Sequence, residues 1–281
     1  MDEATEHVRA LARRVVAAAL ELGPLRAALL AGSGARGDAD FYSDVDLLLY
    51  VDELPPEDRL ERLRQAVAGT GPVPIAPPHL VQFHVGGVAV QVGYRTVAQI
   101  EDELEGALGR LEEVIGSPNQ KMLAGLLEGV PLHGDDVIAG WRTRVAAYPD
   151  ELRVASIAHH WSFFPLWYYG DAMALRDSEL WRLDMLLEAA FNLLGVLAAL
   201  NRVYYARFEL KRLRALVAKL PLAPPNLADR LEQLFVLPAD DAAAELGSLV
   251  VETRDLVARE LPDLELPLRR PPGTRVQPWL P

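Results

Sequence analysis

Residues 32–51 read GSGARGDADFYSDVDLLLYV, and this stretch decides the fold that we expect. It follows an apolar run, residues 25–31, and its last part, residues 43–51, reads as a second strand with acids first and apolar residues after them. Gly32, Ser33 and Gly34 form a small-residue turn at the end of the first strand. Glycine there lets the backbone approach a phosphate and donate amide hydrogens to it.

Two aspartates, Asp44 and Asp46, stand at the start of the second strand, with ten residues between Ser33 and Asp44. Alternation along a strand puts both carboxylates on the same face. Carboxylate oxygens suit Mg²⁺, and one or two such ions stabilise the oxygens of a phosphoryl displacement. Arg36 adds positive charge near the phosphates. An isolated Asp-x-Asp is usually a solvated strand end, but the combination with the preceding strand and turn indicates function.

This combination resembles the signature of the DNA polymerase beta-like nucleotidyltransferases, in particular the small bacterial antibiotic group that modifies aminoglycosides and lincosamides. The resemblance implies that Gly32 and Ser33 hold the terminal phosphates of a nucleotide. It also implies that Asp44 and Asp46 ligate magnesium. The implied fold is a small mixed sheet flanked by helices, followed by a helical domain that closes the cleft.

The rest of the chain fits a small sheet domain followed by helices. Helical spacing and strand-like runs give the expected elements, which are helices over 4–22 and 57–68 and a hairpin of strands 80–85 and 88–94 around Gly86-Gly87. From about residue 97 the chain reads almost entirely helical.

The expected fold class is therefore α/β in the broad sense (α+β), with a division near residue 116. Residues 1–116 would form a nucleotidyltransferase domain with a small mixed sheet. Residues 117–281 would form an all-helical domain that ends in an extended, proline-rich tail.

Lys211 is a second candidate for contact with the triphosphate. Residues 198–213, AALNRVYYARFELKRL, are similar to a segment of related enzymes in which Leu-Asn and a tyrosine precede a triphosphate-binding lysine. The resemblance implies that role for Lys211. The alternative is that Lys211 and Arg212 only cap an exposed helix face.

Gln91 marks a departure from the family pattern. Such enzymes usually carry a third carboxylate on a later strand, as a metal ligand or as the base that deprotonates the acceptor hydroxyl. The matching strand, residues 88–94, has Gln91 at that position. A glutamine offers a neutral carbonyl oxygen to a metal and cannot act as a base. We expect Gln91 to complete the ligand set of Asp44 and Asp46 in this way.

Gln91 leaves three alternatives open. In the first, the site binds one metal well and a second poorly. In the second, the base comes from the helical domain, and in the third, the domain is a degenerate nucleotide binder without transfer activity. The candidates for a base from the helical domain are Asp177, Asp184 and Glu188.

His159 and His160 open a dense aromatic cluster that reaches Tyr169. Aromatic residues at near-helical spacing are usually core. The functional alternative is a stacking wall for a nucleobase or a cation-π surface for an aminated substrate.

Composition limits the partners. The formal net charge is −12, which argues against a nucleic-acid partner and suits a cationic small molecule. The chain has no cysteine, and its first residues lack the pattern of a signal peptide. The apolar run 189–200 is too short to cross a bilayer and reads as a buried helix, so we expect a cytoplasmic protein with no membrane partner.

The expected function is magnesium-dependent transfer of a nucleoside monophosphate from a nucleoside triphosphate to a hydroxyl of a small molecule, with release of pyrophosphate. The resemblance favours ATP and an aminoglycoside-like acceptor. Two alternatives remain. One is a non-catalytic nucleotide-binding module, and the other is nucleotidyl transfer to a macromolecule such as tRNA or protein.

Overall fold

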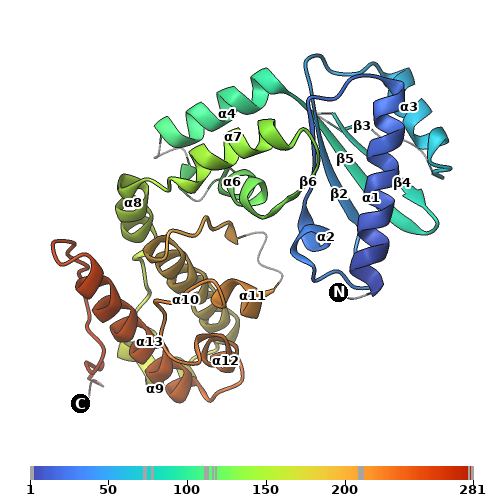
Figure 1. Cartoon of the computed structure of the whole chain (residues 1–281). Helices are drawn as coiled ribbons and strands as arrows, with labels where there is room; N and C mark the ends of the chain where they lie inside the picture. The colour runs from blue at the N-terminus through green and yellow to red at the C-terminus, as the bar shows by residue number, and fades with distance from the viewer. Residues whose placement is uncertain are drawn as a thin grey trace. The chain divides into compact units, whose positions relative to one another are not determined.

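The computed structural model describes residues 3–71, 75–76, 79–110, 114–115, 117, 119–207, 212–277 and 279 (Figure 1). The chain forms two compact units. Unit 1 comprises Met1–Arg110 and Met122–Ala147, and unit 2 comprises Leu111–Lys121 and Tyr148–Pro281. This division does not follow a single boundary near residue 116, because the chain enters unit 2 briefly and then returns to unit 1.

Unit 1 is built on a six-stranded sheet with the order β3-β4-β5-β2-β1-β6. The central strands β2 and β5 are parallel, and all other neighbours are antiparallel, so the predicted mixed sheet is confirmed. Its strands are β1 (Ala27–Leu30), β2 (Val45–Val51), β3 (Ile75–Ala76), β4 (Leu80–Val85), β5 (Val88–Thr96) and β6 (Val130–His133).

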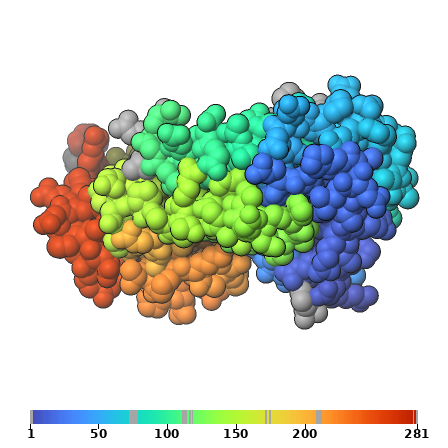
Figure 2. All heavy atoms as spheres, turned by 45° about the horizontal axis from the view of Figure 1, so that its top comes forward, coloured from blue at the N-terminus to red at the C-terminus, as the bar shows by residue number. Residues whose placement is uncertain are grey.

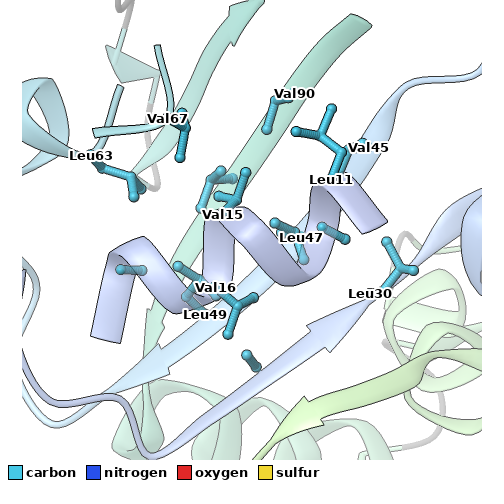
Figure 3. Packing of buried hydrophobic residues seen from close by; sticks show 14 of the residues in the cluster. Leu11, Val15, Val16, Leu30, Val45, Leu47, Leu49, Leu63, Val67 and Val90 are labelled. Atoms are coloured by element: carbon cyan, nitrogen blue, oxygen red, sulfur yellow. The ribbon is translucent and has the colours of Figure 1, made fainter. Parts of the chain in front are cut away.

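Helix α1 (Glu3–Leu22) packs on one face of the sheet, and α3 (Glu57–Ala66) lies beside it (Figure 1). Figure 3 shows side chains of α1 above those of β2 in the core of unit 1. Along β2 burial alternates, with Leu47 buried and Asp46 and Leu48 half-buried. The polar outer side of α1, dark blue in Figure 2, lies at the surface of unit 1. The alternation that buries Leu47 therefore turns Asp46 to the opposite face.

Strand β6 corrects the expectation that residues 117–281 form an all-helical domain. It pairs with β1 at the edge of the sheet, between α6 (Asn119–Glu128) and α7 (Asp135–Ala146). It is short and contains Pro131, which lacks a backbone N–H and is tolerated at a sheet edge. Because the strand is short and contains a proline, its sequence does not show the alternation of apolar residues that predicts a strand.

Helix α4 (Val97–Gly109) follows β5 directly and packs with α7 in unit 1. The two helices are joined by side-chain contacts, since the indole Nε1 of Trp141 donates to Glu101 at 2.5 Å. The Trp141 ring also packs edge-on against buried Tyr50 of β2, with ring centroids 4.7 Å apart. Tyr50 at this end of β2 is therefore buried, whereas Asp46 near the other end is half-buried.

Unit 2 is helical. Its helices are α8 (Asp150–His160), α9 (Leu166–Ala174), α10 (Glu179–Leu200), α11 (Leu213–Val217), α12 (Leu227–Gln233) and α13 (Ala239–Glu260). α10 packs against α8, α9 and α13 (Figure 1). The buried helix predicted at residues 189–200 is present, but it begins at Glu179 and is longer than predicted. Among the described residues, α10 alone is long and apolar enough to cross a membrane by length and composition, and 61% of its apolar window is buried inside the protein.

The described part of the C-terminal tail, residues 261–277, has no helix or strand but is packed against unit 2. The indole of Trp161 donates to the carbonyl of Pro267 at 3.1 Å, and that of Trp167 to the carbonyl of Arg270 at 2.7 Å. The aromatic cluster after α8 therefore supports the tail and the helical core.

Candidate functional site

The glycine-serine stretch begins a short helix, α2 (Gly32–Arg36), where a turn was predicted. Gly32 has φ +64°, a left-handed conformation that glycine adopts without strain. A Cβ added at Gly32 would lie 2.3 Å from Oδ2 of Asp46, and the N–H of Ala31 donates to the carbonyl of Asp46 at 2.9 Å. Glycine is thus required here because the backbone passes directly against the Asp46 carboxylate.

Helix α1 holds α2 in place. The Arg9 guanidinium donates to the carbonyls of Gly34 at 2.8 Å and Ala35 at 2.9 Å. A Cβ at Gly34 would lie 2.5 Å from Cγ1 of Val8, so the second glycine of the motif lets α1 pack closely on α2. Arg9 was not predicted as a site residue, because nothing in its local sequence distinguishes it from other arginines on the exposed side of α1.

Asp44, Asp46 and Gln91 come together on one face of the sheet. Asp46 of β2 pairs with Gln91 of β5 in the parallel register, and side chains of such pairs lie on the same face. Asp44 lies just before β2, and its Oδ2 accepts a hydrogen bond from Nε2 of Gln91 at 2.6 Å. All three side chains are half-buried. Both aspartates therefore lie beside Gln91.

The loop between α2 and β2 is closed by Asp40. Its Oδ1 accepts from the N–H of Tyr42 at 3.0 Å and from the hydroxyl of Ser43 at 3.1 Å, and its own N–H donates to the Ser43 hydroxyl at 2.9 Å. This tight turn leaves Phe41 85% exposed and Tyr42 99% exposed. The turn accounts for the spacing between Ser33 and Asp44, because its residues cross from the end of α2 to the start of β2.

The cationic residues predicted at the site are not all placed by the structure. Arg36 is the last residue of α2, and its Nε lies 3.4 Å from the Asp38 carboxylate. Its exposed side chain faces the half-buried carboxylate of Asp38. Lys211 lies outside the described residues.

The alternative bases Asp177, Asp184 and Glu188 belong to unit 2 and are exposed. Their placement as partners of Asp44 and Asp46 stays a prediction.

The donor set fits a divalent cation. Asp44 and Asp46 supply hard carboxylate oxygens on one face, and Gly32 leaves room where a Cβ would contact Asp46. Within the described part of the chain, no cluster of three or more His, Asp or Glu side chains is arranged to hold a metal. The role of Asp44 and Asp46 as magnesium ligands stays a prediction. The ligand role predicted for Gln91 stays a prediction, since its amide nitrogen is the group in contact with Asp44.

Comparison with known proteins gives one family. Residues 12–123 match the family model described as a nucleotidyltransferase domain, which spans α1 from Ala12 through α2, both aspartates and Gln91. No curated protein matches the sequence. A crystal structure of a nucleotidyltransferase-like protein from Exiguobacterium sibiricum is similar, with a TM-score of 0.41 and 12% identity over 89% of this chain and 74% of that chain. A structural similarity this low adds no weight.

The family match covers less than half of the chain, and it covers the part that contains the site. It supports nucleotidyl transfer, and hence a nucleoside triphosphate as substrate, for residues 12–123. The segment that carries Gly32, Ser33, Asp44 and Asp46 is therefore similar to a nucleotidyltransferase domain by its family match as well as by its residues.

Proposed function

We propose that the protein transfers a nucleoside monophosphate, AMP in the favoured case, from a nucleoside triphosphate to a hydroxyl of a small molecule and releases pyrophosphate. One observation carries this proposal. The Asp44 and Asp46 carboxylates lie beside Gln91 on one sheet face, and the backbone at Gly32 passes directly against Asp46. That arrangement suits a triphosphate held next to a cation-binding carboxylate pair.

Each residue has a role in this proposal. Gly32 and Ser33 orient the phosphates, Gly32 through close approach of its backbone and Ser33 through its half-buried hydroxyl. Asp44 and Asp46 would hold Mg²⁺, which when bound neutralises the triphosphate charge. Arg36 would leave Asp38 to offset charge on the pyrophosphate, a role that we also propose for Lys211.

The proton of the acceptor hydroxyl needs a separate route. Gln91 occupies the position beside Asp44 where the family resemblance places a carboxylate, and an amide cannot accept that proton. We therefore keep Asp177, Asp184 and Glu188 of unit 2 as proposed bases. Each is an exposed carboxylate on or near α10.

The proposed acceptor is a small hydroxyl-bearing compound, and an aminoglycoside-like cation suits the net charge of −12. The same charge argues against a polynucleotide acceptor. We also propose a cytoplasmic location, which is supported by the burial of most of the apolar stretch of α10.

The test removes both carboxylate charges. Asp44→Asn together with Asp46→Asn should lower nucleotidyl transfer by about 1000-fold or more, because the cation contributes several kcal/mol to the transition state. The melting temperature should stay nearly unchanged, since both side chains are half-buried and asparagine has a similar shape. Pyrophosphate release from ATP, measured with a panel of hydroxyl-bearing acceptors, reports the activity.

Asp52→Asn is the matched control. Asp52 follows the other end of β2, is exposed and pairs with Arg26 at 3.2 Å, so its change should leave pyrophosphate release intact. Turnover that survives in the double variant would show that the carboxylate pair is not the reaction centre.

A second candidate function is nucleotide binding without transfer, and the hydrogen bond from Gln91 to Asp44 favours it. The residue beside Asp44 is thus a neutral amide, which cannot accept the proton of the acceptor hydroxyl. Magnesium-dependent binding of ATP with no pyrophosphate release, over the whole acceptor panel, would support this second function and contradict the first.

A further inference from the structure

Gln91 contacts Asp44 through the nitrogen of its amide. The distance from Nε2 to Oδ2 of Asp44 is 2.6 Å. An ionised carboxylate only accepts hydrogen bonds, so the NH₂ group of Gln91 must face it, and Oε1 must point elsewhere. In this arrangement Gln91 contacts a proposed cation ligand through its donor group.

This contact reduces what the carboxylate pair can offer to cations. Oδ2 of Asp44 already accepts a charge-assisted hydrogen bond, which occupies one lone pair of that oxygen and weakens it as a ligand for a second cation. Two divalent ions in a phosphoryl-transfer site lie about 3.5–4 Å apart and repel each other. They need bridging carboxylates to offset that repulsion. Two aspartates supply a formal charge of −2, where a third carboxylate would give −3.

No neighbour in the sheet restores the missing charge. Gln91 pairs with Asp46 on one side and with Gln82 of β4 on the other, so this row of side chains reads Asp46, Gln91, Gln82. In the next row, Ala89 of β5 pairs with His84 of β4. Among the described residues of β4 and β5, these positions carry no carboxylate.

We propose that Gln91 makes the Asp44–Asp46 pair a site for one divalent cation instead of two. It does so by binding Asp44 Oδ2 through its amide and by replacing a third carboxylate with a neutral group. Gln91 is thus a positioning residue that fixes Asp44 and sets the number of cations. This inference rests on the cation site of the proposed function, and it specifies how that site is loaded.

The experiment counts Mn²⁺ bound to the full chain in the presence of a non-hydrolysable ATP analogue, by electron paramagnetic resonance of the free ion. The unaltered protein should bind one Mn²⁺ in its complex with the analogue, and Gln91→Asp should bind two. Gln82→Asp is the matched control, because it adds the same charge to the same row one strand farther from Asp44. It should bind one.

A further variant keeps the test usable if aspartate at position 91 disturbs the sheet. Gln91→Ala should still bind one Mn²⁺, with an affinity lower by about 10-fold to 100-fold, because groups that orient a metal ligand typically contribute this much. Thermal unfolding of each variant separates loss of the fold from loss of the cation. A count of two in the unaltered protein, or equal affinities for it and Gln91→Ala, contradicts the inference.

The failure of this inference is distinguishable from the failure of the proposed function. If the protein binds two Mn²⁺ and releases pyrophosphate, the role of Gln91 is wrong and the proposed function stands. If neither the unaltered protein nor Gln91→Asp binds Mn²⁺ with the analogue, both are wrong. If Gln82→Asp also binds two, charge alone sets the count, and the positioning role of Gln91 is wrong.

Discussion

Two glycines, one in each unit, lie so close to a neighbouring side chain that an added Cβ would clash with it. A Cβ at Gly32 in unit 1 would lie 2.3 Å from Oδ2 of Asp46, and a Cβ at Gly195 in unit 2 would lie 2.4 Å from Cγ of His160. The surroundings differ. Gly32 and Asp46 are half-buried, whereas His160, the last residue of α8, is 9% exposed and packs against Gly195 of α10. In unit 1 the missing side chain leaves room for the carboxylate of Asp46, and in unit 2 it leaves room for the packed ring of His160.

Asp46 has polar, half-buried side chains beside it, whereas His160 has a buried aromatic ring beside it. Asp46 lies next to Gln91 and close to Asp44, and these polar groups are kept partly accessible. His160 packs edge-on against the ring of buried Tyr205, with ring centroids 5.7 Å apart. We therefore expect substitutions in the first region to lower activity and substitutions in the second to lower stability.

Gly32→Ala should give the largest effect in this comparison. The new Cβ must displace the Asp46 carboxylate, and a misplaced reacting group of this kind costs about 100-fold in kcat/KM. The left-handed backbone, φ +64°, should add a loss of about 1 kcal/mol in the free energy of unfolding. Steady-state kinetics and urea unfolding measure the two effects separately.

Gly86→Ala is the matched control for the backbone effect. Gly86 has φ +59°, and a Cβ there would meet nothing within 4 Å. It should therefore lose a similar amount of stability and keep its activity. Equal losses of activity in both variants would mean that backbone strain, and not contact with Asp46, explains the result at Gly32.

Gly195→Ala should lower the free energy of unfolding by about 2 kcal/mol, because overpacking at the His160 ring exceeds the helix-propensity gain of alanine. The folded variant should keep its kcat/KM. Gly140→Ala is a helical control without a neighbour within 4 Å, and it should be neutral or up to about 1 kcal/mol more stable. A Gly195→Ala protein as stable as Gly140→Ala would show that His160 moves away at no cost.

Local patterns in the sequence were enough to predict the central strands of the sheet in unit 1. The acids followed by an apolar run at residues 43–51 and the paired glycines of the hairpin predict strands close to those observed. The spacing of Asp44 and Asp46 predicts their common face, because neighbouring residues on a strand have a fixed geometry. Each of these features depends on residues that are near one another in the chain.

Contacts between distant segments were not predictable in this way. The hydrogen bond from Gln91 to Asp44 depends on the parallel register of β2 and β5, and the contact of Arg9 with α2 depends on how α1 packs. Strand β6 was missed because it is short and contains a proline. The aromatic cluster after His160 was predicted as core, and its packing against helices and tail agrees with that interpretation.

The buried histidine also makes the stability of the second region depend on pH. Burial, followed by the charge of His159, lowers the pKa of His160 to about 4 from its ordinary value of about 6.5. The unfolded chain therefore binds the proton more readily than the folded one. The contribution of neutral His160 to stability is complete above pH 6.5 and is lost as the pH falls toward 4.

Between pH 7 and pH 5 this loss should amount to about 1 to 2 kcal/mol. His160→Phe keeps a ring of similar size and removes the titration, so its free energy of unfolding should fall less over the same interval by that amount. Urea unfolding at both pH values measures the difference, and carboxylates that titrate in both proteins cancel. Parallel pH profiles for the two proteins would mean that His160 accepts a proton in the folded core as readily as in the unfolded chain. Its burial would then not lower its pKa.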